Sequence, residues 1–298
     1  MFDYLSLSDA IADVLRARLA GRVAAPERLA VPVPGGVLLS MPAADDTVAI
    51  VKNITVHPQN KDLPVIQGEV LVLDAATGRK FAVLDARELT ARRTAAVSLL
   101  AARLLAADKR GPLLVIGAGV QAGAHAAAFC QGLGVGKVLV ASRTRARAVA
   151  LAVELGGQGI AARVADDVAA AARDASMIVT ATTSQEPVFP DVVRDDVFVA
   201  AVGSFTPEAA EVPASLVSRA TLFVDDLPSA RVEAGDFLRA DVNWEQVTPL
   251  ERILDAPPHP AGPVIFKTVG HAIFDLAGAK HAMRGRRGEE ESARGETL

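Results

Sequence analysis

The first part of this chain shows the alternation of apolar and polar residues that is typical of strands with one covered face. From residue 28 to residue 86, short alternating runs are separated by turn residues, among them Gly78. A side-chain period of two predicts a sheet that buries at least one of its faces. The predicted strands cover residues 37–41, 47–56, 69–74 and 80–85.

The second part alternates short apolar runs with stretches of helical periodicity. This alternation implies right-handed crossovers, and it predicts an α/β, Rossmann-type, doubly wound parallel sheet. The predicted strands cover residues 113–116, 137–141, 162–164, 177–180, 197–202, 221–224 and 264–267. Predicted helices of this part cover residues 145–155, 167–173 and 229–238.

Further helices are predicted outside this alternation. The first is capped by Ser6 or Ser8 and ends at Gly21. Residues 284–298 are charged and carry no apolar pattern, so they are predicted to form a disordered tail. The remaining predictions are a helix at 90–107, a domain junction at 108–112 and a final helix at 271–283.

Composition excludes several classes of function. A net charge of -4 in 298 residues gives no bulk attraction to nucleic acid or to an anionic membrane. Cys130 is the only cysteine, so a disulfide framework and a thiolate metal cluster are excluded, and no metal is expected. We find neither a signal peptide nor an apolar run of membrane-spanning length, and we expect a cytoplasmic protein.

The sequence Gly117-x-Gly119-x-x-Ala122 lies between a predicted strand and a predicted helix. Gly117 allows a sharp turn, Gly119 lets the backbone approach a pyrophosphate, and a small Ala122 lets the helix pack against the strand. We therefore predict a dinucleotide site that includes Gly117, Gly119 and Val120. The alternative is an ordinary strand-to-helix turn.

The tip of the second strand of this predicted sheet indicates which dinucleotide is bound. It carries no acidic residue to hold the ribose hydroxyls of NAD. Instead Ser142 and Thr144 can donate hydrogen bonds, and Arg143 with Arg145 or Arg147 can pair with a phosphate. This set favours NADP(H), with NAD(H) as the alternative cofactor. The other interpretation is a solvated basic helix start.

Two cations occupy positions where apolar residues are expected. Lys52 lies between Ile50 and Ile54 on one face of its strand. Arg93 extends the apolar stripe of the helix at 90–107 toward its amino terminus, where the helix dipole would help it to hold a carboxylate. A charge on an apolar face is costly unless it is paired or meets a ligand. Lys52 and Arg93 are therefore candidate ligands of a substrate carboxylate, and an internal salt bridge for each is the alternative.

A series of motifs over residues 28–277 resembles the ornithine cyclodeaminase/mu-crystallin family. The motifs are Met41-Pro-Ala, Lys52-Asn-x-x-x-His57-Pro-x-Asn60, Gly68-x-x-Leu71-x-x-Asp74-x-x-Thr-Gly78, Leu89-Thr-x-x-Arg93-Thr-Ala-Ala96 and Gly117-x-Gly119-Val-Gln121-Ala122. The resemblance implies that the Rossmann-type domain, residues 111–270, is inserted in an α+β substrate-binding and dimerisation domain of residues 1–110 and 271–298. A homodimer is therefore expected.

The resemblance also implies roles for individual residues. Arg28, Lys52 and Arg93 would meet the carboxylate of the substrate and the atoms beside it. Gln121 and Thr182 would lie along the cofactor, and Thr268 would lie near the nicotinamide.

One departure from the family changes the expected substrate. In ornithine cyclodeaminases an Asp occupies the position of Phe205, where it handles the substrate amino group. Phenylalanine takes up no proton and neutralises no ammonium, so Phe205 fits an apolar wall against a ring. The overall pattern is similar to that of the ketimine reductases of the family, which implies NADPH-dependent reduction of Δ1-pyrroline-2-carboxylate or Δ1-piperideine-2-carboxylate to L-proline or L-pipecolate.

If the chain is a ketimine reductase, we expect Arg93 and Arg28 to hold the substrate carboxylate, and Lys52 either to orient that carboxylate or to donate a proton. His57 is a further candidate for this role, but a histidine followed by a proline at a strand end is more often structural. The alternative activities are those of an ornithine cyclodeaminase or an amino-acid dehydrogenase that uses NAD(P). A non-catalytic, NADPH-dependent binding protein of the mu-crystallin type is the alternative from another class.

Overall fold

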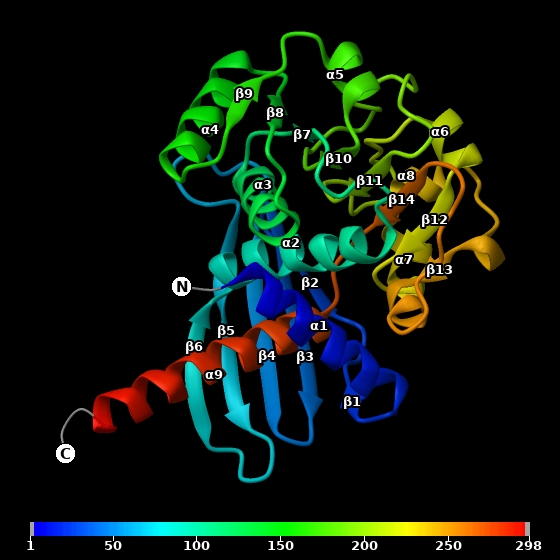
Figure 1. The fold of residues 1–298 in the computed structure, drawn as a ribbon. Coiled ribbons are helices and arrows are strands. Elements are labelled where there is room, and N and C mark those ends of the chain that lie inside the picture. The colour runs from blue at the N-terminus through cyan, green and yellow to red at the C-terminus, as the bar shows by residue number, and fades with distance from the viewer. Residues whose placement is uncertain (1–2, 296–298) are drawn as a thin grey trace. The chain divides into compact units, whose positions relative to one another are not determined.

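The computed structural model describes residues 3–295, and the side chains of residues 3–284. The chain forms two compact units (Figure 1). Unit 1 comprises Met1–Arg93 and His271–Leu298, and unit 2 comprises Thr94–Gly270. The sequence placed the first boundary after residue 110. The structure places it inside helix α2, Ala86–Leu105, because the second half of this helix packs on residues of unit 2, such as His125 and Gly132.

Unit 1 is built on an antiparallel sheet in the order β1-β3-β4-β5-β6, with β2 paired to β3. Helix α9, Ala272–Gly295, packs on β3, on β4 and on helix α1, Tyr4–Leu19. The side chains of Ile50, Ile54, Val70 and Val72 are buried on the covered face of the sheet. The strands are Val23–Ala24, Leu29–Val33, Gly36–Asp45, Val48–Val56, Ile66–Asp74 and Lys80–Asp85, numbered β1 to β6.

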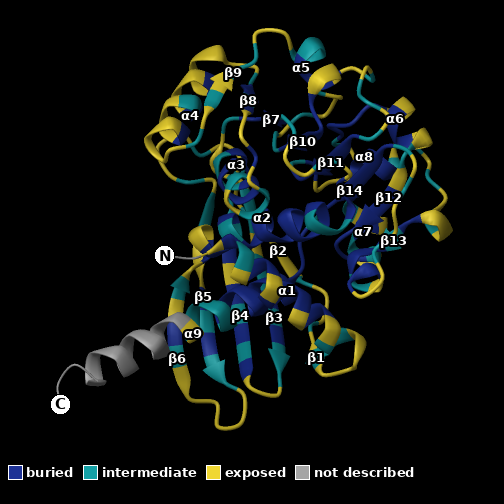
Figure 2. Ribbon diagram, in the orientation of Figure 1, coloured by how far each residue is buried: buried dark blue, intermediate teal, exposed yellow. Residues whose placement is uncertain are grey.

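Unit 2 is built on a parallel sheet in the order β13-β12-β14-β11-β10-β7-β8-β9. Its central strands are buried along their whole length (Figure 2). The strands are Leu113–Ile116 (β7), Val138–Ala141 (β8), Ala162–Val164 (β9), Met177–Thr180 (β10), Phe198–Ala201 (β11), Thr221–Val224 (β12), Thr248–Pro249 (β13) and Val264–Lys267 (β14).

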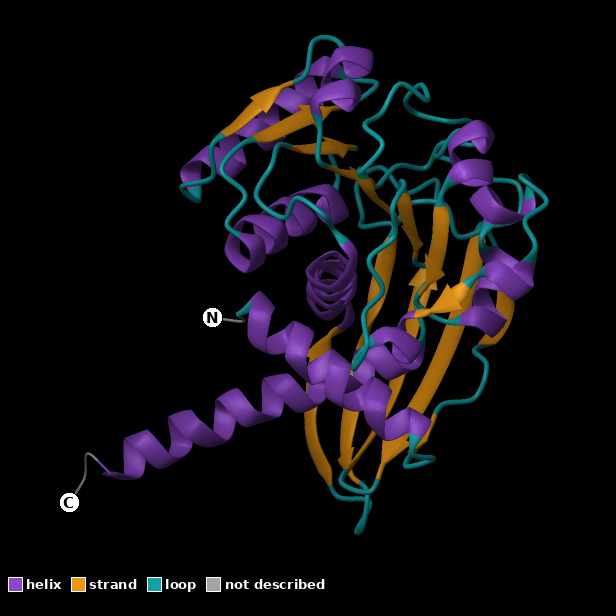
Figure 3. Ribbon diagram, turned by 45° about the vertical axis from the view of Figure 1, so that its right-hand side comes forward, coloured by secondary structure: helices purple, strands orange, loops and turns teal. Residues whose placement is uncertain are grey.

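Helices separate most of the strands along unit 2, although β10 is followed by β11 without a helix (Figure 3). The chain runs outward from β7 to β8 and β9, and then returns to the other side of β7 to form β10 and β11. A ligand site is expected at such a reversal, beyond the carboxyl ends of the strands. The predicted Rossmann-type α/β fold is therefore confirmed. The helices are Val120–Leu133 (α3), Arg145–Gly157 (α4), Val168–Asp174 (α5), Ala214–Arg219 (α6), Leu227–Glu233 (α7) and Gly235–Leu238 (α8), and 3-10 turns lie at Trp244–Gln246 and Leu250–Ile253.

Acidic side chains decide where two helices begin. Helix α1 starts after Asp3, whose carboxylate accepts hydrogen bonds from the backbone N–H groups of Leu5 and Ser6, so the predicted Ser6 and Ser8 caps are wrong. Helix α2 starts four residues earlier than predicted, because Asp85 accepts from the N–H groups of Arg87 and Glu88. Arg93 is consequently the eighth residue of α2, and the argument that placed it within reach of the helix dipole does not hold.

Two other helix predictions need correction. The helix predicted at 229–238 is divided into α7 and α8 at Ala234. The tail predicted to be disordered from Arg284 is helical as far as Gly295, while residues 296–298 lie outside the described residues. Arg, Glu and Ala extend an existing helix at little cost, because elongation avoids the unfavourable nucleation step. Among the described residues, no helix has the length and apolar character needed to cross a membrane.

Candidate functional site

The turn after β7 has the geometry that a dinucleotide site requires. Gly117 adopts φ 129°, and a Cβ atom there would lie 2.4 Å from the carbonyl oxygen of Ala181. A Cβ on Gly119 would meet no atom within 4 Å, so space is open beside the backbone. Helix α3 begins next to it without a side-chain cap, which leaves backbone N–H groups available to an anion. Val120 is exposed in the first turn of this helix.

Gln121 gives a direct indication that this turn holds a ligand. Its Oε1 atom is buried and has no hydrogen-bond partner in the described structure. A buried acceptor without a donor is costly, and a bound group is one way to satisfy it. The residues present at this turn therefore fit a dinucleotide.

The tip of β8 presents the basic residues predicted to select NADP. Arg143, Thr144 and Arg147 are exposed, and Ser142 is half-buried. The backbone N–H of Thr144 donates to Ser142 Oγ over 3.4 Å. Arg145, the third arginine of this cluster, donates to Asp166. Arg143 and Arg147 are thus the arginines better suited to pair with a phosphate.

Thr182 and Thr268 follow the carboxyl ends of β10 and β14. The N–H of half-buried Thr182 donates to Glu211, and the buried hydroxyl of Thr268 donates to Asp225 Oδ2 over 2.6 Å. Because β7, β8, β10 and β14 run in parallel in one sheet, their carboxyl ends point the same way. All the predicted cofactor residues therefore lie beyond the carboxyl ends of the strands of unit 2.

Unit 1 brings Lys52 and Arg93 together on a single carboxylate. The Nζ atom of Lys52 lies 3.1 Å from Asp275 Oδ1 and 3.3 Å from Oδ2. The Nε atom of Arg93 lies 3.0 Å from the same Oδ1 atom. Lys52 enters from the middle of β4, where it pairs with Met41 and Val70, and Asp275 enters from the first turn of α9. All three side chains are buried.

Burial and the two cations determine the protonation of this cluster. Burial lowers the pKa of Lys52 to about 8, against the opposing effect of the Asp275 charge. Burial favours the neutral form of Asp275, but the charges of Arg93 and Lys52 outweigh it and lower the pKa of this carboxyl. Near neutral pH the cluster therefore holds two positive charges and one negative charge.

The internal salt bridge that was the alternative interpretation is therefore present for both cations. It uses one shared carboxylate, however, so the three side chains keep an excess positive charge. Arg28 adds to it, because its charge is close enough to lower the pKa of Lys52. Arg28 is half-buried just before β2. A substrate carboxylate would add a second anion beside Lys52 and Arg93, which share the single charge of Asp275.

Asp275 is a member of the candidate site that the sequence analysis missed. Its signal is an acidic residue within Ala272–Ala279, where every other residue is apolar or glycine. The same cost argument that selected Lys52 and Arg93 applies to this carboxylate. Its partners lie far away in the sequence, so only the folded chain shows which cations it meets.

Phe205 and His57 are two further candidates from the sequence. Phe205 belongs to unit 2, follows β11, and is 51% exposed. The ring of His57 packs so closely on Gly36 that a Cβ atom there would lie 2.8 Å from His57 Nδ1, and the His57 N–H donates to Val65 O. These contacts are consistent with a structural role for His57.

The strand order and the glycine turn of unit 2 define a Rossmann-type protein. The chain belongs to the ornithine cyclodeaminase/mu-crystallin family, whose sequence profile matches residues 2–286.

Relatives of known activity cover almost the whole chain. It is 40% identical to Delta(1)-pyrroline-2-carboxylate reductase 1 of Burkholderia multivorans, over 95% of this chain and 91% of the relative. It is 33% identical to the ketimine reductase mu-crystallin of Mus musculus, over 93% and 92%. The solved structure of Thermococcus litoralis Delta(1)-pyrroline-2-carboxylate reductase with NADH and L-proline matches with a TM-score of 0.88 and 26% identity, over 95% and 93%.

Proposed function

We propose that this chain is an NADPH-dependent reductase of cyclic 2-carboxy imines, with Δ1-pyrroline-2-carboxylate and Δ1-piperideine-2-carboxylate as substrates and L-proline and L-pipecolate as products. The observation that carries the proposal is the 40% identity to a Δ1-pyrroline-2-carboxylate reductase over nearly the full length of both proteins. The solved reductase that binds NADH and L-proline supports the same substrate class.

The cations of unit 1 act as the carboxylate-binding group in this proposal. Arg93 keeps its Nε on Asp275, which leaves its terminal nitrogens to bind a second carboxylate. Asp275 orients Arg93 and Lys52, and it reduces the repulsion between them before substrate binds. Arg28 completes the group. Fixing the carboxylate determines which ring atom is presented for reduction, and such positioning supplies much of the catalysis.

Lys52 is the proposed source of the proton or the group that orients the carboxylate. The bound coenzyme supplies hydride to the C2 carbon of the imine. The product nitrogen must also carry a proton at neutral pH, and a Lys52 pKa of about 8 lies near that pH. Phe205 supplies an apolar surface and no charge, which suits a ring without a distal ammonium group.

NADP(H) is proposed as the preferred cofactor. Arg143 and Arg147 are exposed cations beside the tip of β8, and residues 142–147 include no acidic residue to repel a 2′-phosphate, while the nearby Asp166 is paired with Arg145. The structure of the related Thermococcus litoralis enzyme contains NADH, so the activities of this chain with NADPH and with NADH have to be compared directly.

A homodimer through unit 1 is also proposed. The sheet face opposite Lys52 carries apolar side chains, and among them Val31, Leu38 and Val83 are exposed. Val31 pairs with Leu38 across β2 and β3, so these two side chains are contiguous, and Val83 lies on the same face in β6. A contiguous apolar face on an antiparallel sheet is typical of a protein interface. The proposed partner is a second copy of this chain.

The test is the oxidation of NADPH and of NADH with each cyclic imine acid, followed by identification of the amino-acid product. We expect turnover with the cyclic imines and a higher kcat/KM with NADPH. A protein that releases ammonia from ornithine and leaves both imines unchanged would contradict the proposal. Turnover that depends on free ammonia would identify an amino-acid dehydrogenase instead.

A further inference from the structure

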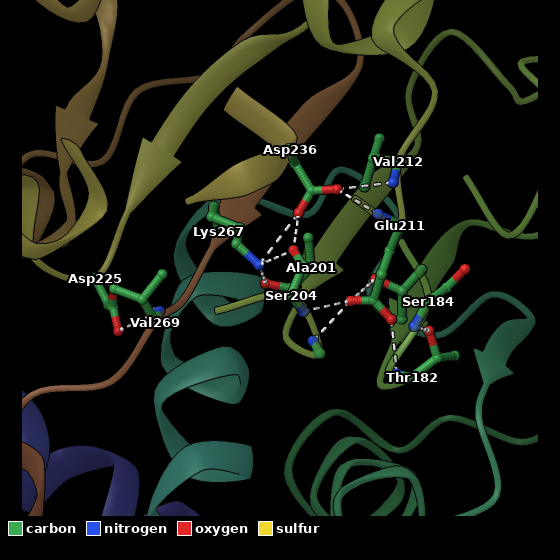
Figure 4. A network of polar contacts seen from close by, with 12 residues as sticks. Thr182, Ser184, Ala201, Ser204, Glu211, Val212, Asp225, Asp236, Lys267 and Val269 are labelled. Atoms are coloured by element: carbon green, nitrogen blue, oxygen red, sulfur yellow. Dashed lines mark hydrogen bonds and ion pairs between the residues drawn. The ribbon is translucent and has the colours of Figure 1, made fainter. Parts of the chain in front are cut away.

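A buried carboxylate joins the two loops that follow β10 and β11 in unit 2. Glu211 Oε1 accepts from the N–H of Thr182 over 2.6 Å. Its Oε2 accepts from the N–H of Gly203 over 2.7 Å, from the N–H of Ser204 over 3.1 Å and from the hydroxyl of Thr180 over 3.1 Å. Figure 4 shows this carboxylate between the two loops. One side chain therefore fixes the backbone on both sides.

The two loops approach each other too closely for any side chain at Gly203. A Cβ atom there would lie 2.1 Å from Thr182 O and 2.6 Å from Glu211 Oε1. The two loops can therefore approach this closely only with a glycine at position 203 and with the Glu211 carboxylate between them. Phe205 follows directly in the same loop, so its position depends on the hydrogen bonds that Glu211 accepts.

A second layer of buried polar groups holds Glu211. Asp236 accepts hydrogen bonds from the N–H groups of Glu211 and Val212. The Lys267 Nζ atom lies 3.2 Å from Asp236 Oδ2 and donates to Ser204 Oγ over 2.7 Å. Ser204 in turn donates to Asp236 (Figure 4). A network in which the members satisfy one another is rigid.

The partners of Glu211 favour an ionised carboxylate. The three backbone N–H groups can only donate, so each needs an acceptor. Burial raises the pKa of Glu211, and the charge of Lys267 and the hydrogen bond from Thr182 oppose this effect. For Asp236, burial favours the neutral form, but the charge of Lys267 and the hydrogen bonds from Ser204, Glu211 and Val212 together lower the pKa.

Rossmann topology places these loops on the nicotinamide half of a dinucleotide. The reversal of strand order lies between β7 and β10, with the glycine turn on β7 and the basic tip on β8. If the adenosine half lies over β7 and β8, the other half extends over the carboxyl ends of β10 and β11. The loops joined by Glu211 lie at those two ends.

We propose that Glu211 is a positioning residue for the nicotinamide half of the coenzyme, an inference that rests on the proposed function for the identity of that coenzyme. Glu211 holds Thr182 and the segment Gly203–Phe205 in the arrangement that receives the ring. Asp236 and Lys267 keep Glu211 itself in place. None of these three groups needs to touch the coenzyme.

The test compares two ligands that differ only in the nicotinamide. Binding of NADPH and of 2′-phosphoadenosine 5′-diphosphoribose, which is NADPH without its nicotinamide, is measured by calorimetry for the wild type and for Glu211→Gln. The amide replaces one acceptor oxygen with a donor, so one loop is released. We expect the Kd for NADPH to rise about tenfold, while the Kd for the fragment changes less than about twofold.

Asp108→Asn is the matched control. Asp108 likewise accepts from a backbone N–H, that of Gly111, and from a hydroxyl, that of Ser176, but it does so before β7 and β10 at the opposite edge of the same sheet. We expect this variant to bind both ligands as the wild type does. Equal weakening of both ligands by Glu211→Gln, or no weakening of either, would overturn the proposal.

A second variant and a second pair of ligands are available for this test. If Glu211→Gln does not fold, Glu211→Asp, which keeps the charge but is one methylene shorter, takes its place with the same expectation. If the wild type binds only NADH, the pair becomes NADH and ADP-ribose. Because the measurement needs no imine substrate, failure of the proposed reaction and failure of this inference give separate results.

Discussion

Lys52 and Asp275 form a buried ion pair between residues 223 positions apart in the sequence. The Asp275 carboxylate lies 3.1 Å from the Lys52 ammonium, and both side chains are at most 1% exposed. The last helix of the chain thereby completes a charged cluster on the first sheet. Buried pairs of this kind are weak evidence for stability by themselves, because desolvation offsets the attraction. In the proposed function, they hold two cations ready for a second anion, the substrate carboxylate.

Removing the shared carboxylate should destabilise unit 1. Asp275→Asn leaves Lys52 and Arg93 buried beside each other without an anion, and we expect a loss of about 3–5 kcal/mol in the free energy of unfolding. Urea unfolding measures this change. Glu88→Gln is the control, because the Glu88–Arg92 pair is exposed and should cost less than about 1 kcal/mol. Equal stability of Asp275→Asn and the wild type would show that the ion pairs do not hold the cluster.

The pH dependence of activity should report the titration of Lys52. If Lys52 acts in its protonated form, kcat/KM falls as the pH rises through about 8, where the buried ammonium loses its proton. In Asp275→Asn the fall should move to lower pH, because the Asp275 charge raises the pKa of Lys52. Steady-state kinetics over this pH range, with Lys52→Met as the control, measures both effects. A fall that persists unchanged in Lys52→Met belongs to another group.

Stability in mild acid should depend on His125. Its ring is buried, Nδ1 donates to Gln121 O over 2.7 Å, and Nε2 accepts from the Ser98 hydroxyl over 3.0 Å. Burial lowers the pKa of His125 to about 4, below the 6.5 of an exposed histidine. The unfolded chain therefore binds more protons between these values, so the stabilising contribution is complete above pH 6.5 and is lost as the pH falls toward 4.

From these two pKa values we expect the wild type to lose about 2 kcal/mol between about pH 7 and pH 5 through this residue. His125→Asn cannot titrate, so this part of the pH dependence should vanish, although the variant is less stable at neutral pH. Thermal unfolding of both proteins at the two pH values measures the difference. The same decrease in both proteins would assign the effect to other groups.

Coenzyme preference should depend on the exposed arginines after β8. We expect Arg143→Ala and Arg147→Ala to raise the KM for NADPH about tenfold and to leave the KM for NADH nearly unchanged, because only NADPH carries the 2′-phosphate. Arg145→Ala is the control, since Arg145 pairs with Asp166. Steady-state kinetics with both coenzymes measures these KM values. Parallel changes for NADPH and NADH would show that the arginines do not read the phosphate.

The proposed dimer interface is tested by placing a charge on the exposed sheet face. Val31→Asp introduces a carboxylate among apolar neighbours, and a buried charge without a partner should dissociate the dimer. Light scattering coupled to size-exclusion chromatography measures the mass. Val153→Asp, on the exposed side of α4 in unit 2, should leave the mass unchanged. A wild type that is already monomeric would contradict the homodimer.

Hydrophobic periodicity was sufficient to predict most strands and the class of the fold. Runs such as Leu113–Ile116 and Val264–Lys267 match the observed strands because fully buried strands are short, apolar and bounded by turn residues. Helix ends were predicted less well. The caps at Asp3 and Asp85 depend on which of several polar residues has the extended backbone, and periodicity does not contain that information.

The sequence by itself determined the glycine turn, the basic tip of β8 and the two misplaced cations, because each depends on residue type and local spacing. Only the tertiary structure decided that Lys52 and Arg93 share Asp275, and that Glu211 joins the loops after β10 and β11. Those partners are set by the packing of α9 on β4 and by the order of strands in the parallel sheet. Both are contacts between segments that are distant in the sequence, where local pattern carries no information.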